Sequence, residues 1–418
     1  MSDGVAVLSA ASFMRRSNDT EFPYRQESNF YYLSGINEDN CIILFKKSAQ
    51  VQKTYLFLKE VSSKESLWIG KRMGIKGASS TYSFDAVFAL ESFEEKSKEF
   101  LKDAPMIYFD IFQETLLNKK LKLTCKELLH HRGVLKSPRS FADVYEITQK
   151  MRLIKSKEEI VLIRKAISIT KKAHHKAMRL AHPYISEQKI SAKIEYIFAS
   201  NKAQHNAYEN IVAGGNRANI LHYIDNNKTL KEGQLVLIDA GCEYKMYASD
   251  ITRTFAVSGK FTKAQKELYE MVLHVQLEII KMIQPGITKK ILQDASEELL
   301  TQGMIKLGIL KGKLKKLIKK KKHKKYYLHG IGHWMGIDVH DPCPYVDEKG
   351  EQIAFQAGMV LTIEPGIYID KKDKKVPQKY RGIGIRIEDN ILVTQNGCEN
   401  LSKDIAKTVQ EIEKMCYS

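Results

Sequence analysis

Short apolar runs alternate with amphipathic stretches in the first third of the chain. Cys41–Phe45, Thr54–Leu58 and Met106–Asp110 are compact apolar runs, which are typical of buried β-strands. Glu94–Leu101 and Gln113–Leu129 mix polar and apolar residues and are predicted to be helices. Buried strands that alternate with helices indicate a mixed or mostly parallel sheet covered by helices. We therefore expect an α/β domain at the N-terminus, without a cluster of metal-binding residue types.

Longer amphipathic segments dominate the rest of the chain. In Lys157–Leu180, apolar side chains recur at helical intervals. Three further helices are predicted at Glu187–Lys202, Lys263–Ile283 and Lys290–Leu300. Gly133 and Pro138 interrupt the pattern before this region, so a domain boundary is expected near them. The 418 residues are accordingly divided into a domain of residues 1–138 and a larger domain of residues 139–418.

Two apolar segments of the larger domain repeat one pattern. Gly233–Gly241 aligns without a gap on Gly358–Gly366, with glycine at both ends and an isoleucine followed by a carboxylate at the same offset. These carboxylates are Asp239 and Glu364. Two unrelated buried strands would also be compatible with so short a match. We favour a pseudo-two-fold domain in which each half offers one carboxylate at the end of a strand.

A second aspartate follows Asp239 closely. Asp250 lies near the start of the strand-like segment Ser249–Val257, and on a period of two residues it shares a face with Thr252 and Thr254. A turn between the two strands would let them pair and place the two aspartates side by side. Adjacent carboxylates repel each other, so this pair requires either a shared proton or a cation.

The later part of the domain favours the cation. His333 supplies an imidazole, and Glu364 and Glu388 supply carboxylates at or within apolar strands. Together with the two aspartates, these acids would balance the charge of two divalent cations. Oxygen-rich ligation favours Mn²⁺, with Co²⁺ or Zn²⁺ as alternatives. Two such ions about 3.5–4 Å apart can hold a bridging hydroxide and polarise a carbonyl group, which indicates a hydrolase.

Further polar residues lie beside these ligand candidates. His222, His329 and His340 could bind a carbonyl oxygen or a developing oxyanion, although a structural role is equally compatible with His222. His329 and His333 are four residues apart, so one helical turn could place both on one face. Arg386 lies two residues before the last of the acids and could orient a ligand carboxylate.

Positive charge is concentrated in one segment. The chain has a net charge of +18, and Lys311–Lys325 alone contains 10 lysines. A block of like charge is usually a solvated helix face or a mobile segment. Nucleic-acid binding is the alternative, but aromatic side chains for base stacking first occur at Tyr326 and Tyr327. We therefore do not expect nucleic acid to be the main partner.

Three features bear on the cellular location. No run of about 18 uncharged apolar residues indicates a transmembrane helix. Met1–Met14 is mildly apolar, but Arg15 and Arg16 follow it instead of preceding it, which is the reverse of a secretory signal. The six cysteines are scattered without a CxxC pair, which suits free thiols in a reducing compartment. A cytoplasmic protein without membrane contact is expected.

The sequence around the acids and histidines resembles the Xaa-Pro aminopeptidase (aminopeptidase P) family of pita-bread metallopeptidases. The likeness rests on VLIDAGCEYKMYASDITRTF, HGIGHWMGIDVHD, LTIEPGIY and RGIGIRIEDN, which are similar to the family's metal-site motifs. Arg16–Gly35 and Trp68–Gly74 resemble its N-terminal signatures, so the likeness covers nearly the whole chain. It implies an α+β protein, with a smaller α/β domain before a pita-bread (creatinase/aminopeptidase) domain of pseudo-two-fold halves.

The resemblance also implies roles for individual residues. It places five residues on metal-ligand positions, with the second and fifth bridging: Asp239, Asp250, His333, Glu364 and Glu388. It places three more on positions that handle the substrate and the tetrahedral intermediate: His222, His329 and His340. It places Arg386 and Tyr368 on positions that support the ligands. Glu364 would also handle a proton. The implied reaction removes the N-terminal residue from peptides with proline in second position, by attack of a hydroxide that bridges two metal ions.

Other readings of the chain stay open. The resemblance implies a homo-oligomer, a dimer or tetramer, in which Trp68 of the N-terminal domain could reach a neighbouring active site; a buried core tryptophan is the simpler alternative. A prolidase would apply the same chemistry to Xaa-Pro dipeptides. A non-catalytic pita-bread protein would bind nucleic acid through the lysine run, although the complete ligand set argues against it.

Overall fold

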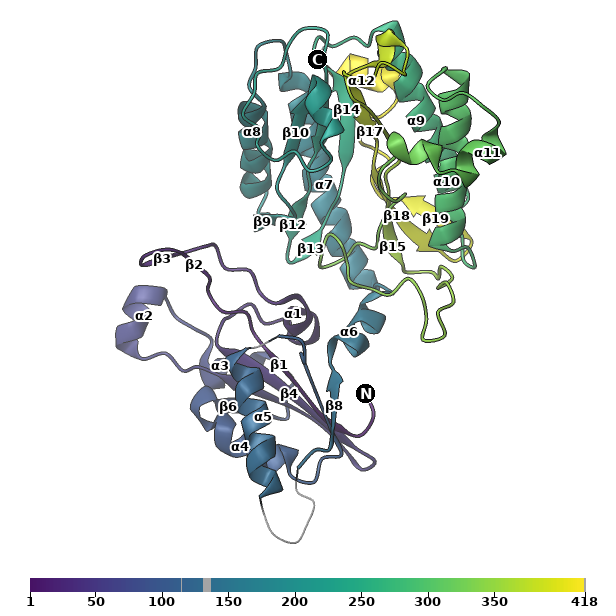
Figure 1. Ribbon diagram of the computed structural model, residues 1–418. Helices are drawn as coiled ribbons and strands as arrows, with labels where there is room; N and C mark the ends of the chain where they lie inside the picture. Colours follow the sequence, from purple (N-terminus) through teal and green to yellow (C-terminus); the bar gives the residue numbers. More distant parts are fainter. Residues whose placement is uncertain (114, 131–136, 417–418) are drawn as a thin grey trace. The chain divides into compact units, whose positions relative to one another are not determined.

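The computed structural model describes residues 1–113, 115–130 and 137–416, and it divides into two compact units, Met1–Met151 and Arg152–Ser418 (Figure 1). The first unit therefore extends beyond residue 138, where the sequence placed the end of the first domain. Strand β8 (Ser140–Asp143) follows that position and pairs in parallel with β7 (Met106–Phe109). Pro138 precedes the last strand of this sheet, and Gly133 lies outside the described residues.

The first unit is built on one mixed sheet with the strand order β6-β5-β4-β1-β7-β8. The other strands are β1 (Gly4–Ser9), β4 (Cys41–Ser48), β5 (Val51–Leu58) and β6 (Ala86–Ala89), and a small hairpin is formed by β2 (Arg15–Ser17) and β3 (Thr20–Glu21). The helices are α1 (Ser28–Ser34), α2 (Ser63–Ile69), α3 (Gly74–Thr81), α4 (Phe93–Leu101), α5 (Leu116–Leu129) and α6 (Tyr145–Arg152). The predicted α/β organisation is confirmed.

Strand β1 lies in the middle of this sheet, although the sequence pattern did not single it out. It pairs antiparallel with β4 and parallel with β7. Val5 and Val7 pack into one apolar cluster, whereas Ala6 and Leu8 pack into another. Alternate residues of β1 thus face opposite sides of the sheet, and both sides are covered.

Trp68 lies on α2 and is 85% exposed, beside Leu67 at 86% and Ile69 at 53%. The alternative of a buried core tryptophan is therefore wrong. Large side chains with this much exposed apolar area, adjacent to one another, are typical of interaction surfaces.

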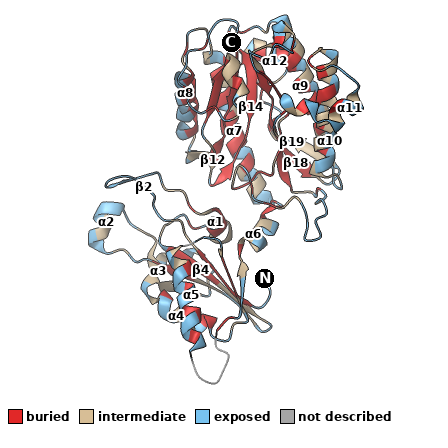
Figure 2. Ribbon diagram, in the orientation of Figure 1, coloured by how far each residue is buried: buried red, intermediate tan, exposed pale blue. Residues whose placement is uncertain are grey.

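The second unit consists of helices packed around several short antiparallel sheets, whose strands are largely buried (Figure 2). Its helices are α7 (Lys157–Leu180), α8 (Glu187–Ser200), α9 (Lys263–Lys281), α10 (Lys289–Lys306), α11 (Leu314–Lys319) and α12 (Val409–Cys416). The four predicted helices correspond to α7 through α10. Ser156 and Glu159 form a capping box that begins α7, and Thr262 and Gln265 form one that begins α9.

Two of these sheets carry the repeated sequence pattern. The first joins β10 (Ile211–Gly214), β11 (Leu235–Asp239) and β14 (Thr252–Ala256), and the second joins β15 (Val360–Ile363), β18 (Asp389–Thr394) and β19 (Gly397–Asn400). Asp239 is opposite Thr252 in the first sheet, and Ile363 is opposite Asp389 in the second. The two halves therefore use the same antiparallel pairing, as the sequence echo predicted.

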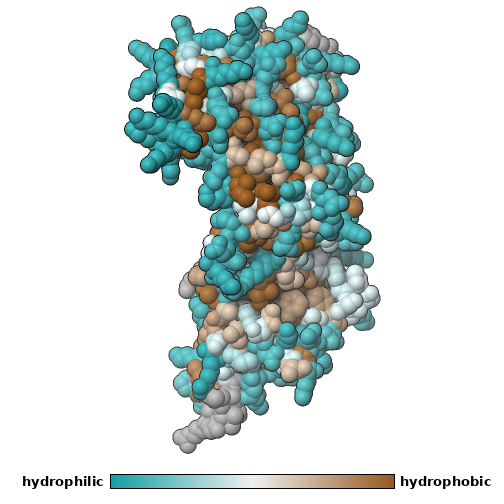
Figure 3. Space-filling view, turned by 90° about the vertical axis from the view of Figure 1, so that its right-hand side faces the viewer, coloured by the Kyte–Doolittle hydropathy of each residue, from teal (hydrophilic) through white to brown (hydrophobic). Residues whose placement is uncertain are grey.

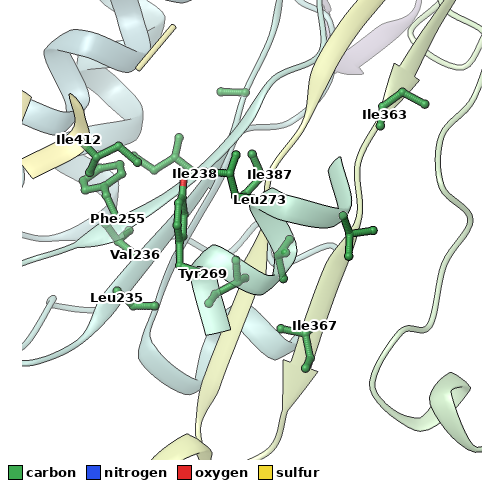
Figure 4. Packing of buried hydrophobic residues seen from close by; sticks show 14 of the residues in the cluster. Leu235, Val236, Ile238, Phe255, Tyr269, Leu273, Ile363, Ile367, Ile387 and Ile412 are labelled. Atoms are coloured by element: carbon green, nitrogen blue, oxygen red, sulfur yellow. The ribbon is translucent and has the colours of Figure 1, made fainter. Parts of the chain in front are cut away.

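Connections between the paired strands form smaller hairpins. β12 (Cys242–Tyr244) and β13 (Tyr247–Ala248) occupy the first connection, with β9 (His205–Asn206) alongside β12. β16 (Gly366–Ile369) and β17 (Ile383–Arg386) occupy the second. Apolar residues from both halves and from α9 and α12 pack into one core, including Val236, Phe255, Leu273, Ile363 and Ile412 (Figure 4).

Arg253, a fully buried residue of β14, links the two halves. Its guanidinium donates to the main-chain oxygen of Glu388 at 2.6 Å and to Asp389 Oδ1 at 2.7 Å. Asp389 also binds Lys407 Nζ at 2.5 Å. Although burial opposes it, the charges of Arg253 and Lys407 hold the pKa of Asp389 well below its usual range. The buried ion pair is thus hydrogen-bonded on both sides, which buried charges require.

The lysine run forms α11 and a short 3₁₀ turn (Lys322–Lys325), anchored by the buried Leu317 and His323. Lys324 Nζ lies 2.7 Å from Glu297 Oε1, whereas most other lysines of the run are exposed. Figure 3, which views the side of α10 and α11, shows hydrophilic side chains over much of the second unit there. Among the described residues, no helix is long and apolar enough to cross a membrane.

Candidate metal centre

A cavity of about 600 Å³ opens in the second unit between the two strand pairs. Its wall contains nine of the ten residues that the sequence proposed for the site: His222, Asp239, Asp250, His329, His333, His340, Glu364, Arg386 and Glu388. The tenth, Tyr368, contacts Arg386 and His329. Residues from both halves and from the segment after the lysine run therefore meet at one place. The volume is in the range of pockets that bind small molecules and short peptides.

The first half contributes two buried aspartates. Asp239 is the last residue of β11, and Asp250 lies two residues before β14. Because β11 and β14 pair antiparallel, the end of one strand is beside the start of the other. Tyr208 OH lies 2.6 Å from Asp239 Oδ1 and 2.5 Å from Asp250 Oδ1. The strand pairing predicted for the aspartates is confirmed.

The second half repeats this geometry with glutamates. Glu364 directly follows β15, and Glu388 directly precedes β18. His333 Nε2 lies 3.3 Å from Asp250 Oδ2 and 3.8 Å from Glu364 Oε1, which brings the imidazole between the halves. Three overlapping groups have ligand atoms within 4.8 Å of one another: Asp250, His333 and His340; His333, Glu364 and Glu388; Asp239, Asp250 and Glu388.

The ring orientation of His333 suits a metal ligand. Its Nδ1 lies 3.0 Å from the main-chain oxygen of Trp334, an acceptor, so this nitrogen carries the proton. Nε2 therefore faces the carboxylates. Although burial opposes it, Asp250 raises the pKa of His333 in the metal-free site, and loss of that Nε2 proton would expose a lone pair for a metal ion. The main-chain N–H of His333 donates to Thr362 Oγ1 at 3.1 Å, and Trp334 is buried. The ring is therefore fixed from behind by its own segment.

Burial, with a smaller effect from the crowding of the acids, raises several of their pKa values. Burial, followed by repulsion from Asp250, raises the pKa of Glu388 well above its usual range. Burial also raises the pKa of Asp239, against the effect of Arg386, and raises that of Glu364 to about 7. For Asp250, burial is outweighed by His333, so its pKa is lowered. Four carboxylates at one point need more positive charge than one guanidinium supplies, which fits divalent cations.

Arg386 is the main cation within the cluster. Its Nη2 lies 2.5 Å from Asp239 Oδ2, its Nη1 donates to Tyr368 OH at 3.0 Å, and its Nε donates to Thr252 Oγ1 at 3.1 Å. Burial is opposed by the surrounding charges of Tyr368 and the acids, and the pKa of Arg386 stays well above its usual range. The guanidinium therefore stays charged and orients the Asp239 carboxylate.

His329 and His340 contact different groups. His329 Nδ1 lies 2.8 Å from the main-chain oxygen of Gly330, and its Nε2 lies 2.7 Å from Tyr368 OH. Burial lowers the pKa of His329 to about 3, so the ring is neutral. The His340 ring is exposed, with its centroid 4.1 Å from that of His333. Residues 328–341 are irregular, so the helical turn suggested for His329 and His333 is wrong.

His222 is exposed at the cavity wall, on a loop that a buried glutamate fixes. Glu187, the first residue of α8, accepts hydrogen bonds from Gly214 N at 2.9 Å and Arg217 Nε at 2.7 Å through one oxygen. Its other oxygen accepts from Tyr223 OH at 2.8 Å and Lys228 N at 3.0 Å. One buried side chain thus anchors the chain on both sides of His222.

Several site residues were not found from the sequence. Tyr208 lies in an irregular segment that gives no periodic signal, yet its hydroxyl reaches both aspartates. Asn390 Oδ1 accepts from Asp250 N at 3.1 Å, and its Nδ2 donates to Asp250 O at 2.6 Å. Lys289 also lines the cavity. The position of Asn390 two residues after Glu388, like that of Thr252 after Asp250, was a signal that the repeat could have supplied.

Comparisons with known proteins place the chain in a family. Residues 161–395 match the model described as metallopeptidase family M24, and residues 1–108 match the one described as aminopeptidase P, N-terminal domain. The chain belongs to the M24 metallopeptidases. The family and the pita-bread fold predicted from the motifs are confirmed, and so is its class, a metal-dependent hydrolase.

Two bacterial relatives are similar over nearly their whole length. The Xaa-Pro aminopeptidase of Haemophilus influenzae is 40% identical over 96% of this chain and 90% of its own. The Xaa-Pro aminopeptidase of Escherichia coli K12 is 38% identical over 98% of this chain and 93% of its own. The solved structure of proline aminopeptidase P II from Yersinia pestis superposes with a TM-score of 0.95, at 37% identity, over 100% of this chain and 96% of that one.

A zinc-substituted E. coli aminopeptidase P in complex with product is also similar. It has a TM-score of 0.96 and 36% identity, and the match covers 100% of this chain and 95% of that one.

Proposed function

We propose that the protein is an Xaa-Pro aminopeptidase, a metallo-exopeptidase that removes the N-terminal residue of peptides whose second residue is proline. The observation that carries this proposal is the cavity in which four acids and one imidazole from two repeated halves converge. The full-length likeness to Xaa-Pro aminopeptidases supports the same substrate class. The activity follows from the site rather than from the fold alone.

Five residues would hold the metal: Asp239, Asp250, His333, Glu364 and Glu388. We propose two divalent ions because four carboxylates balance four positive charges, with Mn²⁺ favoured by the oxygen-rich set and Co²⁺ or Zn²⁺ as alternatives. When bound, such ions polarise the peptide carbonyl and make a water acidic enough to attack it near neutral pH. Asp250, His333 and Glu388 each occur in two of the overlapping ligand groups, and the resemblance implies that the two acids would each hold both ions.

Glu364 is the group best placed to move a proton. Burial raises the pKa of its carboxyl to about 7 in the metal-free site, and bound cations would lower it, which leaves the carboxylate free to accept a proton from an adjacent water. His329 Nδ1 lies 3.5 Å from Glu364 Oε2, beside the same wall. We propose that Glu364 takes the proton from the attacking water and returns it to the proline nitrogen as the bond breaks.

The remaining polar groups would bind and orient the substrate. His222 and His340 are exposed in the cavity, where either imidazole can donate a hydrogen bond to the carbonyl oxygen or to the oxyanion formed from it. Arg386 and His329 are already bound to other side chains, so their role is to position Asp239 and Tyr368.

Proline sets a special requirement on the cavity. The Xaa-Pro bond is a tertiary amide without an N–H, and its ring fixes the torsion φ. Recognition must therefore use the ring itself instead of a main-chain donor. Apolar residues of the cavity wall offer such a surface: Ile211, Leu221, Ile224 and Val339.

Assembly and location belong to the same proposal. We propose a homo-oligomer, a dimer or tetramer, because Leu67, Trp68 and Ile69 expose large apolar side chains on one short helix. We propose a cytoplasmic location because all six cysteines lie in the described part of the chain as free thiols, as a reducing compartment allows.

One assay tests the activity and the metal together. Metal-stripped protein is re-loaded with Mn²⁺, Co²⁺ or Zn²⁺ and given an Xaa-Pro-Yaa peptide, an Xaa-Pro dipeptide and an Xaa-Ala-Yaa peptide. We expect metal-dependent release of the first residue from the Xaa-Pro-Yaa peptide. Hydrolysis of the dipeptide alone would indicate a prolidase instead, and equal hydrolysis of the alanine peptide would refute proline specificity.

A further inference from the structure

Lys289 is a partly buried cation in the cavity wall. It is the first residue of α10 and lines the same cavity as His333, His340 and Glu364. Burial lowers the pKa of its ammonium group, although the Glu364 carboxylate opposes the shift. Nζ lies 3.8 Å from the centroid of the Tyr345 ring, in a cation–π contact.

Within the described residues, the ammonium group of Lys289 forms no ion pair with a carboxylate. The adjacent Lys290 differs, because it is exposed and binds Asp294 Oδ2 at 2.7 Å. Glu364, the acid that attracts Lys289, is also a proposed metal ligand, so a bound metal ion would neutralise its negative charge. The ammonium group has three donors, and an aromatic face uses none of them in a conventional hydrogen bond.

Contacts on both sides hold the first turn of α10 and the aromatic ring that this ammonium group contacts. The preceding residue, Thr288, forms a β-bridge with Ala354. One turn further along α10, Gln293 Oε1 accepts from Ile331 N at 2.7 Å, which ties the helix to the segment that carries His333. On the opposite side, the Tyr345 ring stacks on Trp334 at a centroid distance of 5.4 Å. The lysine is therefore presented to the cavity by a rigid frame.

We infer that Lys289 forms a carboxylate-binding subsite for the substrate. This inference rests on the proposed function, because the carboxylate is that of an Xaa-Pro peptide. Three sources share the chemistry: an acidic side chain on the first residue, an acidic side chain after the proline, and the free C-terminal carboxylate. An ion pair formed in the ground state as well as the transition state lowers KM more than it raises kcat.

Four peptides separate the three sources. Ala-Pro-Ala amide is the neutral reference, and Glu-Pro-Ala amide, Ala-Pro-Glu amide and Ala-Pro-Ala with a free carboxylate each add one negative charge. For the metal-loaded wild type we expect kcat/KM to exceed that of the reference by about tenfold for at least one charged peptide, which corresponds to about 1.4 kcal/mol. That preference should weaken as the salt concentration rises.

Substitution of Lys289 tests the assignment. In Lys289→Met the ratio of kcat/KM between the charged and the neutral peptide should fall to about one, because KM for the charged peptide rises. Lys289→Arg should keep part of this preference. Lys290→Met, one residue away on the same helix, should keep the wild-type preference. The arginine variant keeps the test open if the methionine variant fails to fold.

Two outcomes overturn the subsite alone and leave the aminopeptidase function intact. Either the wild type hydrolyses all four peptides with similar kcat/KM, or Lys289→Met keeps the full preference. If the metal-loaded wild type hydrolyses none of the four, the proposed aminopeptidase function fails, and the subsite fails with it. A preference that survives in Lys289→Met with unchanged KM values would assign the carboxylate to another residue.

Discussion

The two halves of the second unit share a scaffold but not a chemistry. In each half one acid ends a strand and a second acid precedes the strand that pairs with it: Asp239 and Asp250 in the first, Glu364 and Glu388 in the second. Two residues before the second acid, however, the first half has Ala248 and the second has Arg386. The imidazole of His333 also lies next to β15 through the bridge from Trp334 to Leu361.

The difference shows how a repeated fold can hold four acids in one place. The first half supplies two carboxylates and a tyrosine hydroxyl, whereas the second half brings the positively charged Arg386 and the imidazole as well. Each half also supports the other, because Thr252 Oγ1 donates to Glu388 Oε2 at 2.8 Å and the Asn390 amide binds the main chain of Asp250. The halves therefore share an antiparallel strand pair and are complementary in charge.

The largest effect is expected where each half offers its second acid. Asp250→Ala and Glu388→Ala should each lower kcat/KM about a thousandfold or more, about 4 kcal/mol of barrier, and lower metal content. Peptide turnover and elemental analysis of the purified variants measure both. Asp294→Asn, which changes an exposed acid of α10, is the control. Full activity in either alanine variant would refute the ligand assignment of that half.

Arg386 tests the asymmetry directly. Arg386→Met leaves Asp239 buried without its cation, so the free energy of unfolding of the metal-free protein should fall by about 3–5 kcal/mol. The chain has two tryptophans, so in a Trp68→Phe background the fluorescence during urea unfolding reports Trp334 in the second unit. Stability equal to the parent would mean that the guanidinium does not compensate the acids.

Metal should reduce that loss, because a bound cation replaces part of the missing charge and stabilises the folded state that binds it. Repeating the unfolding curve with Mn²⁺ in excess measures this effect. Arg386→Lys keeps the charge but not the simultaneous contacts with Asp239, Tyr368 and Thr252. Its free energy of unfolding should lie between those of the parent and the methionine variant.

A smaller effect is expected from the reciprocal support between the halves. Thr252→Val removes the hydroxyl that donates to Glu388 and should weaken metal affinity about tenfold, in line with other residues that orient ligands. Calorimetric titration of the metal-free variants measures this, with Thr252→Ser as the matched control that keeps the hydroxyl. If Val and Ser variants bind metal equally well, the hydrogen bond across the halves does not orient Glu388.

The smallest effect is expected from the lysine run, which lies outside the two halves. Changing Lys319, Lys320, Lys321 and Lys322 to glutamine alters exposed side chains and should leave the turnover of an Xaa-Pro-Yaa peptide within about twofold. A steady-state assay at two salt concentrations measures this. A loss above about tenfold, roughly 1.4 kcal/mol of barrier, would mean that the run takes part in catalysis.

Local patterns in the sequence predicted the strand pairs and the clustering of the acids well. The equivalent positions of Asp239 and Glu364 in the two repeated segments predicted the pseudo-two-fold symmetry of the domain. Strand pairing could be predicted because it follows from the alternation of residues along the chain. The helices α7 to α10 followed from apolar periodicity, since each buries one face. These features depend on residues that are near one another in the sequence, so they can be predicted from one sequence alone.

Contacts between distant segments could not be predicted in this way. Tyr208 reaches the aspartates because Ala207 N donates to Gly241 O at 2.9 Å, which joins two irregular segments. The central strand β1 was missed because a short apolar terminus carries no signal of its partners β4 and β7. The spacing of His329 and His333 suggested a helix, but the main chain of residues 331–335 binds β15 and Glu364 instead. Such tertiary contacts override local spacing.

Arg253 has a consequence for the dynamics of the metal centre. Its guanidinium extends from β14 and binds oxygen atoms of Glu388, Asp389 and Ala406. Separating the halves would therefore remove the hydrogen-bond partners of a buried charge, which is energetically costly. The halves should therefore open only in one cooperative event, seen as a single class of slowly exchanging amide hydrogens across β11, β14, β15 and β18. A metal ion would then enter and leave through the cavity mouth, at a rate independent of global unfolding.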